Sequence, residues 1–426
     1  MSIESNASGN QDQSLTSKIR KEFAFLRGDY LILLIGALFI DASLEMAYTY
    51  YPLYVQVIGG SAATLGLLSS IGNIIQALTM IPGGYLADRF GRKWIITIGT
   101  LETAVSYLFF IFAPSWEMLI FGVILRSVFN IYSPAYNAII MDIIPPKSRG
   151  TGYSVLNIIT RVSTTPTPMI AGFLYSSYGL VNGVRFGFTI VFIIYVFAGL
   201  LRSRIKETIG DAEQPSFAEI KESFKGLGMI KEGFEAWRQI LRNAITLFGL
   251  QLIFYMTFMS YTGVSKFFIT QELKIDPIYF STLYSIVGIS NIIFTLPVGK
   301  IIDKYGKKLP MISSLVIFVA ALLLVYFGNL TILYIALPLS GLGSIMFMTA
   351  SALWADIIPQ EFRGRIIGTK AFMEIIAASI GLVTGGFIYD YISHRLPLQI
   401  VITSCGVLFF AFLFYVKEPE KVTPGI

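Results

Sequence analysis

The sequence predicts an all-α membrane protein in which twelve transmembrane helices form two pseudo-symmetric six-helix halves. Three observations lead to this fold class. Hydrophobic residues make up 54% of the 426-residue chain and charged residues only 14%. Apolar stretches of membrane-spanning length follow one another along most of the chain, and two sequence motifs recur at an interval of about half its length.

The composition excludes several classes of protein. Soluble domains carry roughly a quarter charged residues, so most of this surface is expected to contact lipid. Cys405 is the only cysteine and His394 the only histidine, which excludes a disulfide framework and a cysteine or histidine metal centre. We expect no metal and no cofactor. The net charge of +6 is explained by basic loops at a membrane surface, so no nucleic-acid partner is expected.

A helix needs about 20 apolar residues to cross the bilayer at about 1.5 Å per residue. Twelve stretches meet this requirement: 30–57, 64–86, 94–113, 117–141, 150–176, 183–201, 243–269, 278–302, 309–328, 330–356, 364–391 and 396–416. The chain then divides into an N-terminal tail, an N-terminal half, a linker, a C-terminal half and a C-terminal tail, which are residues 1–28, 29–201, 202–242, 243–416 and 417–426.

The distribution of basic residues predicts the orientation in the membrane. With both termini in the cytoplasm, most lysines and arginines lie in the tails, the linker and the loops on the same side, and Lys266 is among the few on the outer side. This bias is typical of a multi-pass protein of the cytoplasmic membrane. Residues 1–28 lack the pattern of a cleaved secretory signal.

In the linker, apolar residues recur at helical spacing among lysines from Phe217 to Leu241. This pattern indicates either an amphipathic helix on the membrane surface or a plain tether.

Two motifs show that the halves are duplicated. The segment from Gly84 to Lys93 is repeated from Gly299 to Lys308, with Asp88 and Asp303 lying 215 residues apart. Asp142 and Asp356 begin a second pair of matching segments, 214 residues apart. A shared period for two separate motifs indicates an internal repeat.

The segment Gly84-x-Leu86-x-Asp88-Arg89-x-Gly91-Arg92-Lys93 resembles the loop between the second and third helices of the major facilitator superfamily. The resemblance covers the chain after about residue 28 and is closest to drug/proton antiporter-like and general members of that family. It implies two six-helix halves that rock around a central cavity. It also implies a conformational gate at one membrane surface. The expected gate residues are Gly84, Asp88, Arg89, Gly91, Arg92, Asp142, Arg149, Asp303, Lys307, Asp356 and Arg363.

Within this gate, the resemblance implies specific roles. Asp88 would cap the start of the eleventh span, and Arg92 would pair with Asp142 to close the cytoplasmic side in the outward-open state. Asp303, Lys307 and Asp356 would form the matching set in the second half.

Two departures from the antiporter pattern stand in the fourth and fifth spans. Arg126 lies 16 residues before Asp142, nearer than in many drug antiporters, and Thr164-Thr165-Pro166-Thr167-Pro168 replaces a Gly-Pro flanked by glycines.

Ionisable residues inside spans are the candidate functional residues, because a charge in a bilayer must pair or face water. They are Asp41, Glu45, Arg126, Arg161 and Glu374. Counting along each span places Asp41, Arg161 and Glu374 about 15–17 Å from the cytoplasmic end, and Glu45 and Arg126 about 22–24 Å from it. We expect one carboxylate to exchange a proton as the substrate changes places, with Arg126 near Glu45. The alternative is a set of fixed structural pairs, such as Glu374 with Lys370.

Aromatic residues are weaker candidates for the wall of a substrate cavity. Tyrosines of the first, fourth and seventh spans could line it, although aromatic residues near helix ends are often interface anchors. The candidates are Tyr48, Tyr132, Tyr136 and Tyr255.

These features predict secondary active transport of a small solute by alternating access, energised by a proton gradient, with efflux of amphipathic compounds as one form. Proton-coupled symport or uniport of a sugar or an organic anion stays open, as does a membrane sensor that does not transport. No Gly-x-x-x-x-Gly-Lys-Ser/Thr loop is present for an ATP-driven pump.

The protein is not expected to be an enzyme: Tyr389-Asp390 is similar to half of an aspartyl protease pair, but no Gly-x-Gly-Asp partner exists. The family resemblance implies a monomer whose partners are the lipid bilayer and a small-molecule substrate.

Overall fold

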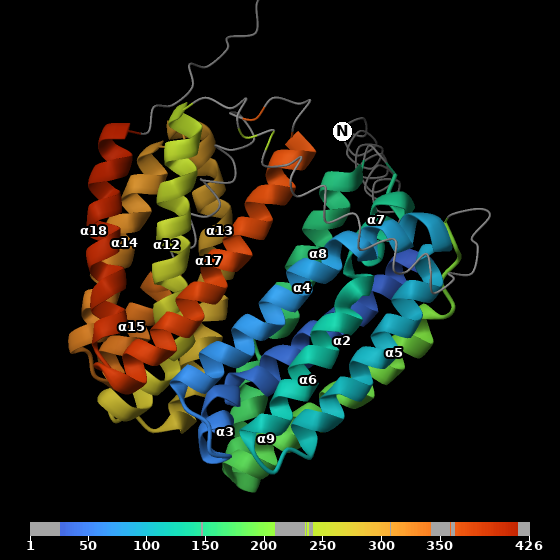
Figure 1. The fold of residues 1–426 in the computed structure, drawn as a ribbon, viewed down its shortest axis with the longest axis horizontal. Helices are drawn as coiled ribbons and strands as arrows, with labels where there is room; N and C mark the ends of the chain where they lie inside the picture. Colours follow the sequence, from blue (N-terminus) through green and yellow to red (C-terminus); the bar gives the residue numbers. More distant parts are fainter. Residues whose placement is uncertain are drawn as a thin grey trace, which may run out of the picture.

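The structure is a computed structural model that describes residues 26–145, 148–208, 235, 237, 242–306, 308–341, 358 and 363–415. Every element in these residues is a helix. Figure 1 shows two bundles, one from each half of the chain, that meet at one end and diverge toward the other. The all-α fold in two helical halves is therefore confirmed.

The N-terminal half contains nine of these elements. They are α2 (Asp29–Thr49), α3 (Tyr51–Val57), α4 (Ala62–Phe90), α5 (Arg92–Ile111), α6 (Trp116–Phe129), η1 (Asn130–Tyr132), α7 (Ser133–Ile143), α8 (Arg149–Thr164) and α9 (Thr167–Arg202). The C-terminal half contains α12 (Arg242–Phe267), η4 (Phe268–Glu272), η5 (Pro277–Tyr279), α13 (Phe280–Tyr305), α14 (Lys308–Phe327), α15 (Leu330–Gly341), α17 (Arg363–Tyr391) and α18 (Leu396–Tyr415).

In the described residues, ten helices are long and apolar enough to cross a membrane, and Leu330–Gly341 is a shorter apolar helix. One of the ten, Thr151–Arg202, has 52 residues, which is enough for two crossings at about 1.5 Å per residue. Gly179 breaks it with φ 75°, a conformation that glycine adopts without strain. Eleven apolar helices, one of them double, match the twelve predicted spans.

Breaks inside single predicted spans are visible only in the structure. The first predicted span, 30–57, is α2 followed by α3, with the backbone leaving helical geometry at Tyr50. Pro52 stands in the first turn of α3, where its missing N–H is not needed. In the fifth span, α8 ends at Thr164 and α9 begins at Thr167. Both breaks lie in helices that line the candidate site described below.

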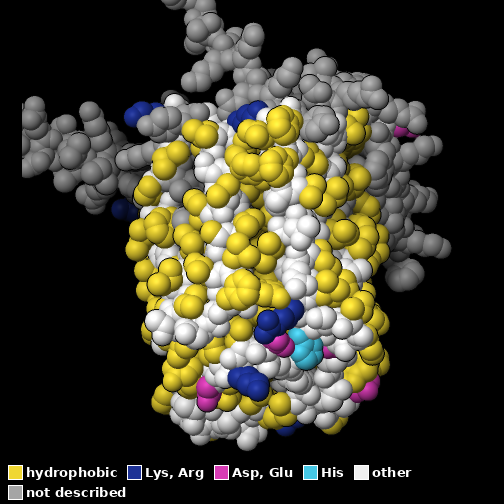
Figure 2. Space-filling view, turned by 90° about the vertical axis from the view of Figure 1, so that its left-hand side faces the viewer, with side chains coloured by type: hydrophobic (Ala, Val, Ile, Leu, Met, Phe, Trp, Pro, Cys, Tyr) yellow, Lys and Arg dark blue, Asp and Glu magenta, His cyan; other side chains and the backbone are white. Residues whose placement is uncertain are grey.

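The outer surface of the bundle is apolar. Large hydrophobic side chains such as Phe112, Phe173, Phe327 and Phe414 are exposed, although nothing in a soluble environment would stabilise them there. Figure 2 shows apolar side chains over the middle of one face and charged side chains toward its lower and upper ends. This distribution is typical of a surface that contacts lipid.

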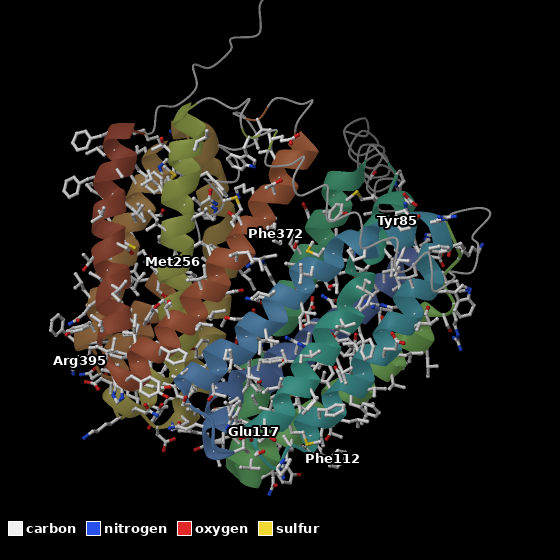
Figure 3. The ribbon with its side chains drawn as sticks, viewed as in Figure 1. Tyr85, Phe112, Glu117, Met256, Phe372 and Arg395 are labelled. Carbon is white, nitrogen blue, oxygen red and sulfur yellow. The ribbon has the colours of Figure 1, made fainter. Side chains whose placement is uncertain are left out.

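The two halves contact each other near one end of the bundle, which we call the closed end. It carries the turns around residues 58–61, 272–279 and 392–395. The opposite end, called the terminal end, carries the start of α2 at Asp29 and the last residue of α9, Arg202. Figure 3 shows Tyr85 toward the terminal end, and Phe112, Glu117 and Arg395 toward the closed end.

Helices α4 and α17 form the main contact between the halves at the closed end. Ser70 Oγ donates to the carbonyl oxygen of Ser379 over 2.7 Å, and the backbones approach so closely at Gly66 that a methyl group there would collide with the carbonyl oxygen of Leu382. Helices α9 and α13 make a second contact, where Gly172 lies against Ser281. The halves are joined through these contacts at the closed end and diverge toward the terminal end (Figure 1).

Candidate functional site

A cavity of about 430 Å³ lies between α2 and α8, and most of the side chains that line it carry a polar group. Its lining residues are Asp41, Leu44, Glu45, Tyr48, Thr160, Arg161 and Thr164. Helix α2 presents Asp41, Glu45 and Tyr48 together because residues four and seven positions apart share one helix face. The opposite face of α2 packs against α9, where Gly187 lies beside Ala47. We refer to this space as the charged cavity.

A second cavity of about 190 Å³ adjoins the charged cavity and reaches the C-terminal half. Glu45, Arg161 and Thr164 line both spaces, and Tyr284, Gly288 and Asn291 of α13 form the facing wall of the second one. Glu45 and Arg161 are exposed although both lie near the middle of their spans. Because the halves touch at the closed end and diverge beyond it, the open side of these cavities faces the terminal end.

Three of the five charged residues expected to act together are therefore assembled by the fold. Asp41, Glu45 and Arg161 come from two helices more than a hundred residues apart and face one water-accessible space. Among the ion pairs of the described residues, none joins any two of these three side chains. Two acidic groups and one basic group thus share a site in which each remains accessible to a proton or a solute.

Arg126 and Glu45, expected to lie near each other, form none of the ion pairs among the described residues. Arg126 Nη1 donates to the hydroxyl of Tyr48 over 3.0 Å, and its guanidinium lies 5.6 Å from the centre of the Tyr48 ring. The phenol groups of Tyr51, Tyr107 and Tyr195 are its other electrostatic neighbours. Aromatic faces and hydroxyls stabilise the guanidinium there, and the Tyr48 hydroxyl joins Arg126 to the wall of the charged cavity.

Glu374 does not line either cavity. Lys370 Nζ donates to its carboxylate over 2.6 Å, and Gln251 Nε2 donates to the same oxygen over 2.8 Å. Tyr255, another predicted cavity residue, lies near Glu374 within the C-terminal half and is absent from the lining of both cavities. This arrangement matches the alternative of a fixed structural pair.

Tyr132 and Tyr136 contact a buried arginine at a position where the sequence predicts the edge of the linker. The guanidinium of Arg202, which is 3% exposed, lies 4.8 Å from the ring centre of Tyr136 and 5.6 Å from that of Tyr132. Arg202 Nη1 also donates to Thr100 Oγ1 over 2.6 Å. Of the four predicted cavity tyrosines, Tyr48 alone lines a described cavity. Asp41 lies close enough to Arg202 for an electrostatic interaction.

Lys266 is predicted as an outer basic residue, but the structure places it inside α12, between the two halves. Its ammonium donates to the carbonyl oxygens of Thr49 over 2.7 Å and Tyr48 over 3.1 Å. It also lies 4.8 Å from the centre of the Tyr284 ring, on the wall of the second cavity. The sequence signal was available, because Lys266 stands before the end of an apolar stretch and intramembrane lysines are rare.

The described part of the gate lies at the terminal end of the N-terminal half. Arg92 forms an ion pair with Asp142, and Arg89 Nη1 donates to the hydroxyl of Tyr85 over 2.8 Å. Gly91 has φ 85°, and Gly306, at the equivalent position of the second half, has φ 82°. This left-handed backbone favours glycine. The duplicated motif therefore forms the same sharp turn twice.

Two features of the gate differ from expectation. Gly84 has ordinary space around it, whereas its neighbour Gly83 packs directly against the backbone of Ile131. Glu207 was not predicted, yet its carboxylate accepts hydrogen bonds from the backbone N–H groups of Arg92 and Lys93, each over 3.0 Å.

The remaining predicted gate residues have side chains outside those that the structure describes. They are Asp88, Arg149, Asp303, Lys307, Asp356 and Arg363.

Most of the linker likewise lies outside the described residues, which include only 202–208, Glu235, Trp237 and Arg242 of it. Trp237 is buried and its ring centre lies 4.5 Å from that of Phe248 in α12. The predicted amphipathic helix in this segment stays a prediction.

Comparison with known proteins places this architecture in a family. The family model of the Major Facilitator Superfamily matches residues 33–268 and 247–425. A "Multi-drug resistance efflux pump PmrA homolog" of Lactococcus lactis subsp. lactis is 25% identical over 389 residues, which cover 88% of this chain and 91% of that protein. The "Tetracycline resistance protein, class H" of Pasteurella multocida is 21% identical over 78% of this chain and 80% of its own length.

Solved structures share the fold. The nucleoside transporter NupG superposes with a TM-score of 0.71 at 16% identity, covering 92% of this chain and all of that one. The human organic anion transporter MFSD10 superposes with a TM-score of 0.62 at 16% identity, covering 91% of this chain and 98% of that one. The family match, the apolar helices and the duplicated halves agree. The chain belongs to the Major Facilitator Superfamily and is a membrane transporter, not an enzyme.

Proposed function

We propose that the protein is a proton-coupled antiporter that exports amphipathic, cationic compounds by alternating access. The observation that carries the proposal is the charged cavity, in which Asp41 and Glu45 share one space with Arg161. In this proposal the terminal end faces the cytoplasm, in agreement with the basic residues of the sequence. The open side of the cavity then takes its substrate from the cytoplasm.

The charge balance of the cavity suits exchange. One carboxylate can be compensated by Arg161, which stays ionised at any physiological pH. The second carboxylate is then left to bind either a proton or the positive group of a solute. Because one group cannot hold both at the same time, binding of one displaces the other. Such competition at a single carboxylate is sufficient to couple the movement of a proton to that of a cation in the opposite direction.

Similarities with other transporters support this choice. Two relatives are named as a multidrug efflux pump homolog and a tetracycline resistance protein. A further relative from Planococcus maritimus, 28% identical over 51% of this chain and 49% of its own length, is named "Na(+), Li(+), K(+)/H(+) antiporter". The first name describes efflux of drugs, the second describes resistance to a drug, and the third describes exchange of a cation for a proton.

The test is proton flux in proteoliposomes that contain the purified full-length chain and a pH-sensitive dye. Cationic amphipathic dyes, neutral sugars and organic acids are added separately. We expect the cationic compounds alone to trigger proton movement, and Asp41→Asn or Glu45→Gln to abolish it. Glu374→Gln is the matched control, because its carboxylate is bonded to Lys370 outside both cavities.

A second candidate function is transport of an organic anion, favoured by the exposed Arg161 in both cavities. The same assay separates the two. Proton flux triggered by organic acids and lost in Arg161→Gln would replace the first proposal with this one. No flux with any class, despite a thermal shift on binding, would contradict both proposals and favour a sensor.

A further inference from the structure

Lys266 links the two halves at a point that also contacts the proposed transport site. It belongs to α12 of the C-terminal half, and its two hydrogen-bond acceptors, the carbonyl oxygens of Tyr48 and Thr49, belong to the last turn of α2 in the N-terminal half. The last carbonyls of a helix have no partner within the helix and carry its negative dipole end. A lysine ammonium is therefore a suitable cap for this helix end.

Glu45 lies one turn before that helix end, and Thr49 Oγ1 donates to its carbonyl oxygen over 2.8 Å. The Glu45 carboxylate interacts electrostatically with the ammonium of Lys266. Tyr284 lies near both groups, because its ring centre is 4.8 Å from the Lys266 ammonium and it lines the second cavity together with Glu45. Lys266 is thus hydrogen-bonded to the helix carbonyls, and its ammonium also lies within electrostatic range of a cavity carboxylate.

Other charged and titratable groups surround Glu45 and bear on its charge. Asp41 and Tyr48 lie on its own helix, Arg161 faces it from α8, and Tyr284 faces it from α13. Arg202 of α9 interacts with Asp41. Lys266 differs from all of these because it alone among them is bonded across the halves to the backbone of α2.

We propose that Lys266 is a positioning residue that holds the closed end shut while Glu45 is ionised, and that a proton or a cationic solute at Glu45 releases it. The proposal rests on the proposed function, because it takes the charged cavity as the place where cargo binds. Opening of the closed end must separate α12 from the end of α2, and so must pull the ammonium away from its carbonyls and from Glu45. Neutralising Glu45 removes one of these two attractions.

The consequence is that the transporter opens to the other side only when its cavity is loaded, which is what exchange requires. While Glu45 is ionised and no cargo is bound, the Lys266 contact stays intact and the transporter does not open to the other side. A cavity that holds a proton or a cation has a neutralised Glu45, so the contact is weakened and opening is permitted. Loss of Lys266 would allow the empty protein to open to the other side. Transport of the proton and of the solute would then no longer be coupled.

The test measures the distance across the closed end by electron spin resonance on the full-length chain in nanodiscs. Spin labels are attached to Gln56→Cys in α3 and Ile392→Cys in the turn after α17, both exposed positions, in a Cys405→Ala background. The measurement is made at pH 8 without any added solute. We expect one short distance in the background protein, and a fraction of long distances that rises about tenfold in Lys266→Gln.

Three further variants complete the design. Glu45→Gln mimics the neutral carboxylate and should raise the long-distance fraction similarly, and combining it with Lys266→Gln should add little because both act on one contact. Lys266→Arg keeps the cation and should stay near the background. Lys370→Gln is the matched control, since this lysine bonds within its own half.

An unchanged distance distribution in Lys266→Gln or in Glu45→Gln would overturn the inference. Glu45→Gln tests the contact from the other side should Lys266→Gln not fold. Because no solute is present, this result is independent of the flux assay. Failure of every compound to drive flux, with the Lys266 effect intact, would reject the proposed function alone.

Discussion

The backbone N–H of Ala63, in the first turn of α4, donates to the carboxylate of Asp390 near the end of α17 over 2.7 Å. This bond joins the N-terminal half to the C-terminal half at the closed end. The first N–H groups of a helix have no partner within the helix and attract negative charge. Asp390 therefore stabilises the start of α4 only while the halves are together.

The first prediction concerns this cap. Asp390→Ala should remove about 1 kcal/mol that favours the closed end, and so raise the fraction of molecules open there. The spin-label distance between positions 56 and 392 measures the change. Asp390→Asn keeps an acceptor oxygen and should show a smaller effect. Equal distance distributions in the alanine variant and the background would show that the bond does not favour closure.

The second prediction concerns the close approach of α4 to α17. Gly66→Ala places a methyl group against the carbonyl oxygen of Leu382, and backbone atoms cannot move aside as a flexible side chain can. We expect destabilisation of about 1–3 kcal/mol, as for overpacking elsewhere, seen as a lower midpoint of thermal unfolding. Gly406→Ala is the control, because nothing lies within 4 Å of the added group. A Gly66 variant as stable as this control would refute the close contact.

The third prediction concerns Glu207, which accepts hydrogen bonds from the first N–H groups of α5. Glu207→Ala should cost about 1 kcal/mol, the usual cost of losing a helix cap. It should also loosen the turn at Gly91, next to the Arg92–Asp142 pair. Hydrogen exchange at the start of α5 measures this directly. Protection there that is the same in both proteins would rule out the capping role.

The fourth prediction concerns Glu374. Its bonds to Lys370 and Gln251 lie within the C-terminal half, so Glu374→Gln should leave proton coupling unchanged. It should lower the free energy of unfolding by about 2 kcal/mol, because a charged hydrogen bond is lost. Parallel flux and thermal unfolding measurements on the purified variant check both statements. Loss of coupling with normal stability would return Glu374 to the candidate proton carriers.

Much of the fold could be predicted because its signals are local. Apolar length predicts a membrane helix whatever its neighbours are, and the repeat of Asp88 by Asp303 predicts two equivalent halves. The residues of the charged cavity could be found in the same way, since Asp41, Glu45 and Arg161 are costly anywhere in a bilayer except beside water or a partner. Their depth along each span placed Asp41 and Arg161 at similar levels.

The partner of each charged side chain was less predictable, because depth along a span does not determine how the helix is rotated. Glu45 and Arg126 have similar depths, yet Arg126 turns toward Tyr48 and its neighbouring tyrosines. Arg202 and Lys266 stand near the ends of their apolar stretches, where a lysine or arginine is usually taken as a base at the membrane surface. Only packing showed which groups each of them contacts inside the bundle.

By itself, the sequence determined that this protein crosses the membrane, that its halves are duplicated and that they carry charged residues within the bilayer. These properties depend on the composition of single segments. Tertiary structure alone decided which charges share a cavity, that Lys266 and Asp390 cap helices of the opposite half, and at which end the halves meet. Those properties depend on distances between helices remote in the chain, which no local pattern of residues specifies.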